Sequence, residues 1–163
     1  MTKFLLALDN SAYLDKVLEY VAFQLKNRKD IQIVIFHIKQ ACITIDEILN
    51  EDFDRDILLQ KIEELRRNKK LCKEGREKVA STILEKATKI LTESGIDKEQ
   101  IIFDVVEESG DYAQMIIDKA KEHGCKTVVL GKKGDSIISE YLIGSTAEKV
   151  SRLTKGVTIW LVD

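Results

Sequence analysis

The chain has no proline, no long apolar run and no excess of charge of either sign. The absence of proline excludes little, because it only removes one kind of signal for a boundary between elements. No apolar run approaches the roughly 18 to 20 residues that a membrane-spanning helix needs. Lysine and arginine together number 26 and aspartate and glutamate 28, so the formal net charge is -2. We therefore expect neither a membrane span nor a nucleic-acid partner bound through bulk positive charge.

Cysteine is also scarce. Cys42, Cys72 and Cys125 are odd in number and form no C-x-x-C pair, so we expect neither a disulfide framework nor a zinc site. This use of cysteine fits a reducing cytoplasm. The N-terminal apolar run ends at Asp9 without a small-residue cleavage site, and it is interpreted as a buried strand rather than a signal peptide. We expect a cytoplasmic protein.

What the chain does contain is typical of one soluble globular domain. Its 163 residues are 44% hydrophobic and 33% charged, and we expect a single domain over residues 1–163. Short apolar, β-branched runs predict strands at 3–9, 31–39, 100–107, 126–131 and 157–163. Apolar residues at helical spacing predict helices at 11–28, with Ser11 as N-cap, through 58–95, as one helix or two with a break near Gly75, at 110–124 and at 145–156.

This alternation of strands and helices predicts an α/β fold with a parallel sheet and right-handed crossovers. Ligands of such open sheets bind at the carboxyl ends of the strands, where the strand order reverses. Two turn-rich strand ends stand out, "LDNS" after the first strand and "LGKKG" after the fourth. If these two strands are neighbours, both loops face one crevice.

The segment "GKKGDSIISEYLIGSTAEK", residues 131–149, has two interpretations. Its glycines can be turn residues, and Ser145 can be an ordinary N-cap. Alternatively, Gly131 and Gly134 let the backbone approach a phosphate, and the start of the following helix offers unpaired N–H groups to an anion. Lys132 and Lys133 can supply charge to such a ligand or point into water.

Several other nucleotide and catalytic motifs are absent from the sequence. The chain has no G-x-x-x-x-G-K-[ST], no G-x-G-x-x-G after the first strand and no G-x-S-x-G. It also lacks an S-G-G-x-D-S-like loop, which disfavours an ATP pyrophosphatase. His37 is expected to be a core histidine, and no acid–base pair is found beside the glycines, so an efficient hydrolase is not expected.

The spacing of Gly131, Gly134, Gly144 and Ser145 matches G-x2-G-x9-G-[ST], and here the chain resembles the nucleotide-binding branch of the universal stress protein family. "LLALDNS", "IFHIK" and "GSTAEKVSRLTKGVTIWLVD" resemble the first strand, the second strand and the last helix and strand of that family. The resemblance implies a single doubly wound domain, with a five-stranded parallel sheet in the order 3-2-1-4-5, helices on both faces and ATP in the crevice.

The resemblance also implies the contacts of that ligand, which would be ATP, or AMP or ADP, with Mg²⁺. Adenosine would lie near the end of the first strand and against the backbone of the second, ribose or α-phosphate near the end of the fourth, and the phosphates at the glycines and hydroxyls that follow. Residue by residue, these positions are Ala7, Leu8 and Asp9; Ile38; Leu130 and Gly131; and Gly134, Gly144, Ser145 and Thr146.

The expected function is that of an ATP-binding universal stress protein, a nucleotide-responsive regulator in a stress response. Two alternatives stay open: a slow ATPase or autokinase, with Ser145 or Thr146 as acceptor, and a nucleotide-free module that binds a partner protein. The last strand, 157–163, is expected at a sheet edge that invites pairing with another chain. Members of the family form homodimers through this strand, so the resemblance implies a homodimer here.

Overall fold

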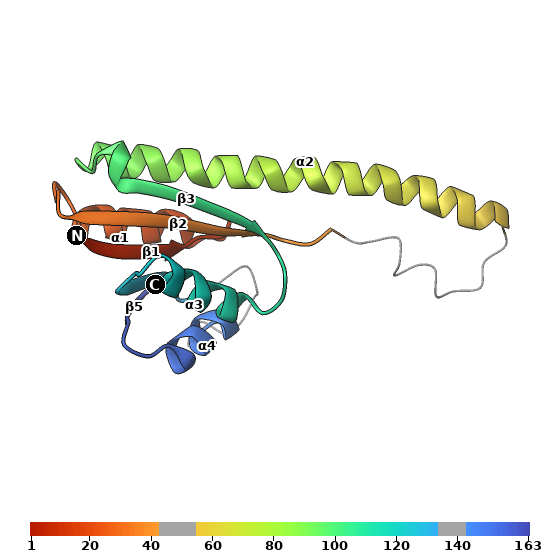
Figure 1. Cartoon of the computed structure of the whole chain (residues 1–163). Coiled ribbons are helices and arrows are strands. Elements are labelled where there is room, and N and C mark those ends of the chain that lie inside the picture. Colours follow the sequence, from red (N-terminus) through yellow and green to blue (C-terminus); the bar gives the residue numbers. More distant parts are fainter. Residues whose placement is uncertain (43–54, 134–142) are drawn as a thin grey trace.

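A five-stranded parallel sheet forms the centre of the molecule (Figure 1). The computed structural model describes residues 1–42, 55–133 and 143–163. The strand order is β3-β2-β1-β4-β5 and every neighbouring pair is parallel, which confirms the predicted fold class and topology. The elements are β1 (Thr2–Ala7), α1 (Leu14–Gln24), β2 (Ile31–Lys39), α2 (Arg55–Glu93), η2 (Lys98–Gln100), β3 (Ile101–Glu107), α3 (Tyr112–Glu122), β4 (Thr127–Gly131), α4 (Ser145–Leu153) and β5 (Thr158–Val162).

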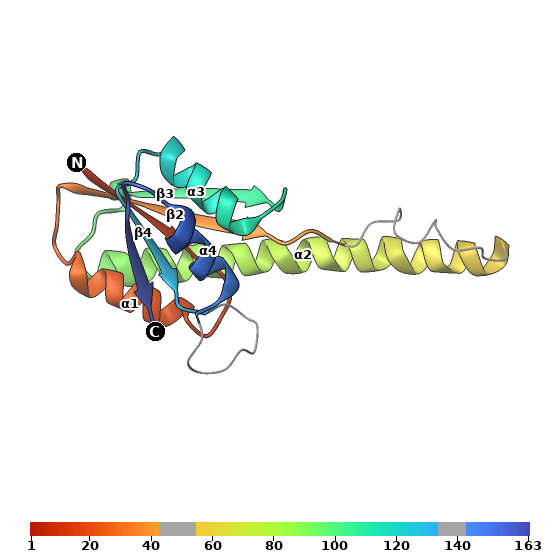
Figure 2. The same ribbon diagram turned by 90° about the horizontal axis from the view of Figure 1, so that it is seen from below.

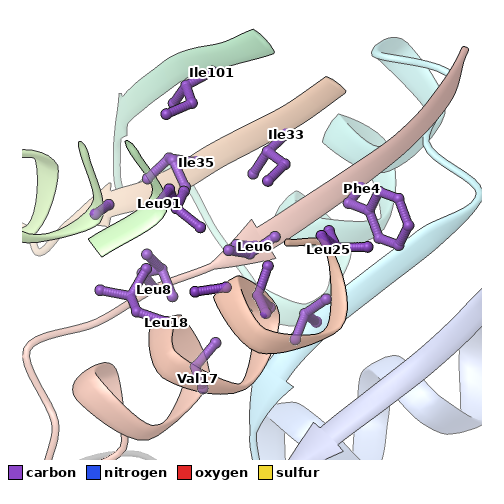
Figure 3. Packing of buried hydrophobic residues seen from close by; sticks show 14 of the residues in the cluster. Phe4, Leu6, Leu8, Val17, Leu18, Leu25, Ile33, Ile35, Leu91 and Ile101 are labelled. Carbon is purple, nitrogen blue, oxygen red and sulfur yellow. The ribbon is translucent and has the colours of Figure 1, made fainter. Parts of the chain in front are cut away.

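Helices cover both faces of the sheet, and each face has its own hydrophobic core. Successive strand residues point to opposite faces, so Leu6 joins the core under α1 and α2 while Leu5 joins the core under α3 and α4. Both side chains are fully buried. Figure 3 shows the first core, where Leu6 and Ile33 from the strands face Leu18 from α1. Burial on two faces explains why the central strands are almost continuously apolar in sequence.

The long segment before β3 forms a single helix, α2, which passes through Gly75 without a break. Its C-terminal half packs on the sheet through Ile83, Ala87 and Leu91, all fully buried. Its N-terminal half extends well beyond the sheet (Figures 1 and 2). A glycine inside a helix lowers stability by about 0.5–1 kcal/mol relative to alanine. This cost is small beside the packing of a helix of 39 residues, and α2 continues through Gly75.

The first helix is shorter than predicted. It begins at Leu14, and Ser11 is not its N-cap. Instead, the Asp9 carboxylate accepts a hydrogen bond from the Ser11 N–H (3.2 Å) and the Ser11 hydroxyl accepts one from the Tyr13 N–H (3.3 Å). These side chains bond to the backbone two residues ahead and form a polar turn between β1 and α1. The helix ends before Asn27, which has a left-handed φ of 58°.

The expectation that the cysteines form no disulfide is wrong for one pair. Cys42 and Cys72 are joined by a disulfide, with their Cα atoms 6.1 Å apart, while Cys125 is a free, buried thiol. The two residues are 30 apart in sequence and meet because α2 returns past the end of β2. Sequence spacing carries no information on such a contact, which depends on the distance between two folded segments.

Helix length and polarity also bear on the membrane prediction. Of the helices in the described ranges, none combines the length and the apolar composition that crossing a bilayer requires. Even α2, the longest of them, carries charged residues along its whole course.

Candidate functional site

A cavity of about 480 Å³ opens at the carboxyl ends of β1, β2 and β4. The chain leaves β1 toward β2 on one side and returns to β4 on the other, so the cavity lies at the point where the strand order reverses. Its volume falls within the range of small-molecule sites. The described lining residues are Ala7, Leu8, Asp9, Asn10, Phe36, His37, Ile38, Lys39, Gln40, Arg76, Val79, Tyr112, Ile116, Leu130, Gly131, Lys133, Gly144, Ser145, Thr146 and Ala147.

All the site residues predicted from the sequence that the structure describes line this one cavity. They come from three strand ends and the start of α4: Ala7, Leu8, Asp9, Ile38, Leu130, Gly131, Gly144, Ser145 and Thr146. Gly134 lies outside the described residues. Positions 137 residues apart in the chain, such as Ala7 and Gly144, are thus brought to a single hollow.

The two ends of the glycine segment meet at this cavity. The N–H of Gly144 donates to the carbonyl of Lys132 (2.8 Å), and the N–H of Lys132 donates to the carbonyl of Val162 (2.7 Å). The end of β4 and the start of α4 are therefore tied to each other and to the end of β5. Lys132 and Gly144 are therefore close in space, although they are separated in the sequence.

The N-terminus of α4 brings backbone N–H groups that have no partner within the helix to the cavity. Gly144 is the N-cap and brings no side-chain cap, and the first intrahelical bond runs from the Glu148 N–H to the Gly144 carbonyl (2.9 Å). The N–H groups of residues 145–147 precede that bond, so they and the positive end of the helix dipole are available to an anion. The hydroxyls of Ser145 and Thr146 add two further groups that can donate.

Gly131 has a packing reason of its own to be glycine. A Cβ atom at this position would lie 2.8 Å from Tyr13 Cβ and 3.2 Å from the Lys133 carbonyl oxygen. Its backbone does not have a positive φ, so the requirement is close approach rather than unusual conformation. Gly131 is thus explained by the contact of β4 with the β1–α1 turn, whether or not a ligand is present.

The two lysines after β4 have different surroundings. Lys132 Nζ donates to the Asp163 carboxylate (2.7 Å), and this bond raises the pKa of Lys132 and lowers that of Asp163. Tyr13 also donates to Asp163 through its hydroxyl (3.2 Å). Lys133 lines the cavity and makes no ion pair with any part of the chain that the structure describes. Of these two lysines, Lys133 is therefore the one that lines the cavity.

The opposite end of the cavity contains a group of residues that the sequence analysis did not identify. Lys39 and Gln40 follow β2, and Arg76 comes from α2. Lys39 Nζ pairs with Glu77 (2.7 Å) and Glu107 (3.0 Å), and these hydrogen bonds raise the pKa of Lys39. Arg76 Nη1 pairs with Glu107 (2.8 Å) and donates to the Gln40 carbonyl (3.1 Å). At this end of the cavity the charges of Lys39 and Arg76 are therefore neutralised by glutamates. No such ion pair of Lys133 is found in the described part of the chain at the other end.

The remaining polar groups of the lining do not form a catalytic pair. His37 is buried, and since a carbonyl can only accept, its Nδ1 donates to the Leu8 carbonyl (2.8 Å), as expected for a core histidine. Burial, with Glu108 nearby, raises the pKa of Tyr112 to about 12, so its hydroxyl stays protonated. Asp9 is the only carboxylate among the described lining residues. The arrangement suits binding better than acid–base chemistry.

Away from the cavity, a cluster of possible metal ligands lies on β3 and at the end of α3. Asp104, Glu122 and His123 bring one ligand atom each to within 4.8 Å of one another. Lys119 Nζ lies between the carboxylates, 3.1 Å from Asp104 and 3.0 Å from Glu122. The ammonium group already supplies the positive charge that a metal ion would bring, so this cluster is an ion-pair network.

Comparison with known proteins gives one consistent result. A family model described as the universal stress protein family matches residues 1–158. The universal stress protein YxiE of Bacillus subtilis is 30% identical over 153 residues, which are 93% of each chain.

Solved structures give the same fold. A universal stress protein in complex with cAMP is 17% identical with a TM-score of 0.63, over 99% of this chain and 97% of that one. The universal stress protein from Archaeoglobus fulgidus in complex with dAMP is 15% identical with a TM-score of 0.58, over 100% and 98%. At such identities these two likenesses concern the fold alone, whereas the family model and the Bacillus relative concern the sequence itself. The chain belongs to the universal stress protein family.

Proposed function

We propose that this protein binds an adenine nucleotide, ATP or else AMP or ADP, and acts as a nucleotide-responsive regulator in a stress response. This places it in the nucleotide-binding branch of the family, with residues 1–163 as one adenine-nucleotide-binding domain. The observation that carries the proposal is the cavity at the strand-order reversal, with the start of α4, which has no side-chain cap, and Lys133 at one end. Two neighbours of the same fold are complexes with cAMP and dAMP, which supports an adenine ligand.

The distribution of charge orients the ligand. The phosphates lie against Gly144, Ser145 and Thr146 with Lys133 beside them, because a helix N-terminus and a lysine in the lining favour an anion there. The base lies toward Lys39 and Arg76, where the cations are already paired with glutamates. The ribose lies between these ends, beside Asp9, Leu130 and Gly131.

The backbone of Ile38 is well placed for the edge of the adenine ring. The Leu8 N–H donates to the Phe36 carbonyl (2.9 Å), so Phe36 turns its backbone groups toward β1. Alternate residues of a parallel strand turn to the same neighbour, so Ile38 also faces this side, where β1 has already ended at Ala7. The Leu8 carbonyl is bonded to His37 instead. This leaves the N–H and C=O of Ile38 available for a base.

Mg²⁺ is part of the proposal only as a companion of the phosphates. It is bound by one or two carboxylates plus phosphate oxygens and waters in nucleotide sites, and Asp9 is the described lining carboxylate that fits this role. Rapid hydrolysis is not expected, since Asp9 has no acid–base partner in the described lining. Phosphate release well above background, or phosphate on Ser145 or Thr146, would favour the ATPase or autokinase alternative.

The test compares nucleotides with adenosine on a charge-altered variant. Ser145→Glu places a carboxylate where the phosphates are expected, while an acid in the first turn of a helix favours folding. We expect calorimetry to give tighter binding of AMP and ATP than of adenosine for the wild type. The variant should lose at least about tenfold in nucleotide affinity and keep its affinity for adenosine.

Ser81→Glu is the matched control, because Ser81 is exposed on α2 and outside the cavity lining. It should bind like the wild type. Gly131 variants are avoided, since an added Cβ collides with Tyr13 regardless of ligand. The proposal would be contradicted if the wild type bound none of the three ligands, or if both variants lost the same factor in nucleotide affinity.

A further inference from the structure

The disulfide between Cys42 and Cys72 joins the two segments that line the base end of the cavity, the end of β2 and helix α2. Cys42 follows the end of β2 by three residues, and Cys72 precedes Arg76 by one helical turn. In Figures 1 and 2 the chain leaving β2 (orange) runs along α2 beyond the sheet. Cys72 is exposed and Cys42 half-buried, so thiol reagents in solution can reach the bond.

The same stretch of α2 forms part of the cavity wall. Arg76 and Val79 line the cavity from α2, and Lys39 and Gln40 line it from the end of β2. The Arg76 side chain contacts this strand end by donating a hydrogen bond from Nη1 to the Gln40 carbonyl (3.1 Å). The wall at the base end is therefore shared between two segments that the disulfide joins.

Without the disulfide, that junction relies on polar contacts with exposed partners. Glu77 and Glu107 pair with Lys39 and Arg76, but both glutamate side chains are more than half exposed, at 51% and 57%. The Lys39 and Arg76 side chains are only 14% and 21% exposed, but water competes for the exposed glutamates and limits what these ion pairs contribute. The apolar contacts of α2 with the core begin only after them, at Val79 and Ala80.

We infer that the Cys42–Cys72 disulfide is a redox control on the nucleotide cavity: the oxidised chain binds an adenine nucleotide more tightly than the reduced chain. This inference rests on the proposed function and names a regulation of the same site. Reduction releases the start of the packed part of α2, so a ligand must then order Gln40 and Arg76 at its own expense.

The redox step balances with a dithiol as reductant. A thiolate of the dithiol attacks Sγ of the exposed Cys72, the S–S bond breaks, and Cys42 leaves as a thiolate that takes a proton from solvent. The second thiol then attacks the reductant's sulfur in the mixed disulfide, which frees the Cys72 thiol and leaves the reductant as a cyclic disulfide. Cys125 takes no part, because it is buried and burial raises the pKa of its thiol.

Linkage makes the effect measurable in both directions. The ordering at stake is about that of one residue's backbone, because these residues lose only part of their order, so reduction should weaken AMP and ATP binding about tenfold. By reciprocity, a saturating nucleotide should make the disulfide harder to reduce by the same factor, which is about 30 mV in reduction potential.

The test uses the full chain, oxidised with glutathione disulfide or reduced with dithiothreitol, and peptide mapping verifies the Cys42–Cys72 bond. Calorimetry with AMP and ATP should give about tenfold weaker binding for the reduced chain. The double variant Cys42→Ser, Cys72→Ser should bind like the reduced chain under either condition. Cys125→Ala, the matched control, should keep the redox dependence.

A second readout needs no nucleotide. Hydrogen exchange at residues 38–42 and 76–79 should become faster on reduction, while the core strand β1 should be unaffected. Equal affinity of the two redox forms, or unchanged exchange, would overturn the inference and leave the proposed function standing. Absence of binding in both forms would overturn both. Failure of the two cysteines to pair under oxidation would overturn the inference alone.

Discussion

The Asp104 carboxylate on β3 meets Lys119 of α3 and His123, the residue that follows this helix. One of its oxygens is 2.7 Å from His123 Nε2 and 3.1 Å from Lys119 Nζ. Burial by itself raises the pKa of Asp104, but the hydrogen bonds from His123 and Lys119 outweigh it and lower the pKa. The folded state therefore favours the ionised carboxylate.

We predict that Asp104→Asn lowers the free energy of unfolding by about 1 kcal/mol at neutral pH, because charge-assisted hydrogen bonds are lost. A lowered folded-state pKa gives stability that is present above the unfolded pKa of about 3.9 and is lost as the pH falls through the folded value. The two stabilities should therefore converge below about pH 4. Urea unfolding at a series of pH values measures this, with exposed Asp118→Asn as control. A difference that does not change with pH would contradict it.

At the scale of elements, α2 combines two different environments in one helix. Leu91 is fully buried against the sheet, whereas Leu71 is 60% exposed in the half that extends away from it. Helix stability in proteins comes mostly from packing of an apolar face, and the N-terminal half has little of it. The disulfide at Cys72 is its main described link to the rest of the chain near this point.

We predict that Leu91→Ala lowers the free energy of unfolding by about 2–5 kcal/mol, while the same change at Leu71 costs under about 0.5 kcal/mol. The first leaves a cavity in the core under α1 and α2, and the second removes a side chain that mostly contacts water. Chemical denaturation of the two variants provides the measurement. Comparable losses would mean that the extended half of α2 is packed in solution.

The elements differ in how far the sequence predicted them. The strands were predicted well because burial on both faces of a parallel sheet leaves a continuous apolar run, as in 31–39. The predicted start of α1 is wrong because the side chains of Asp9 and Ser11 accept hydrogen bonds from backbone N–H groups two residues ahead. These bonds form a turn where the sequence predicts the first turn of the helix. A cap signal and a turn signal use the same residue types, so the sequence did not distinguish them.

The lining of the candidate site was predicted only in part. The residues at the ends of β1 and β4 and at the start of α4 carry recognisable glycines and hydroxyls next to elements whose order fixes their place. Arg76 carries no such signal: it is one cation in the basic stretch 66–78, and only the path of α2 across the end of β2 brings it to the cavity. The Cys42–Cys72 contact depends on the same path.

At the scale of the whole molecule, β5 leaves one side of the sheet open. Among the strands that the structure describes, it pairs only with β4, and an edge strand of this kind presents its outer N–H and C=O groups to another strand. Trp160 is packed inward against Phe4 and Tyr20, with ring centroids 5.5 and 5.7 Å apart. Leu161 is 37% exposed on this edge strand. We propose a homodimer through residues 157–163.

Leu161→Lys should convert this dimer to a monomer. In a two-fold pairing of β5 strands the new ammonium groups of both copies lie near each other, and like charges across paired strands are destabilising. The fold of each copy should be kept, because Leu161 is not part of either buried core. Leu59→Lys is the matched control, since Leu59 is 56% exposed near the start of α2. That end of α2 extends away from the sheet that holds β5 (Figure 1). Sedimentation equilibrium at micromolar concentration should show a dimer for the wild type and the control, and a monomer for Leu161→Lys. A wild-type monomer, or a dimer that persists in Leu161→Lys, would contradict pairing through this edge.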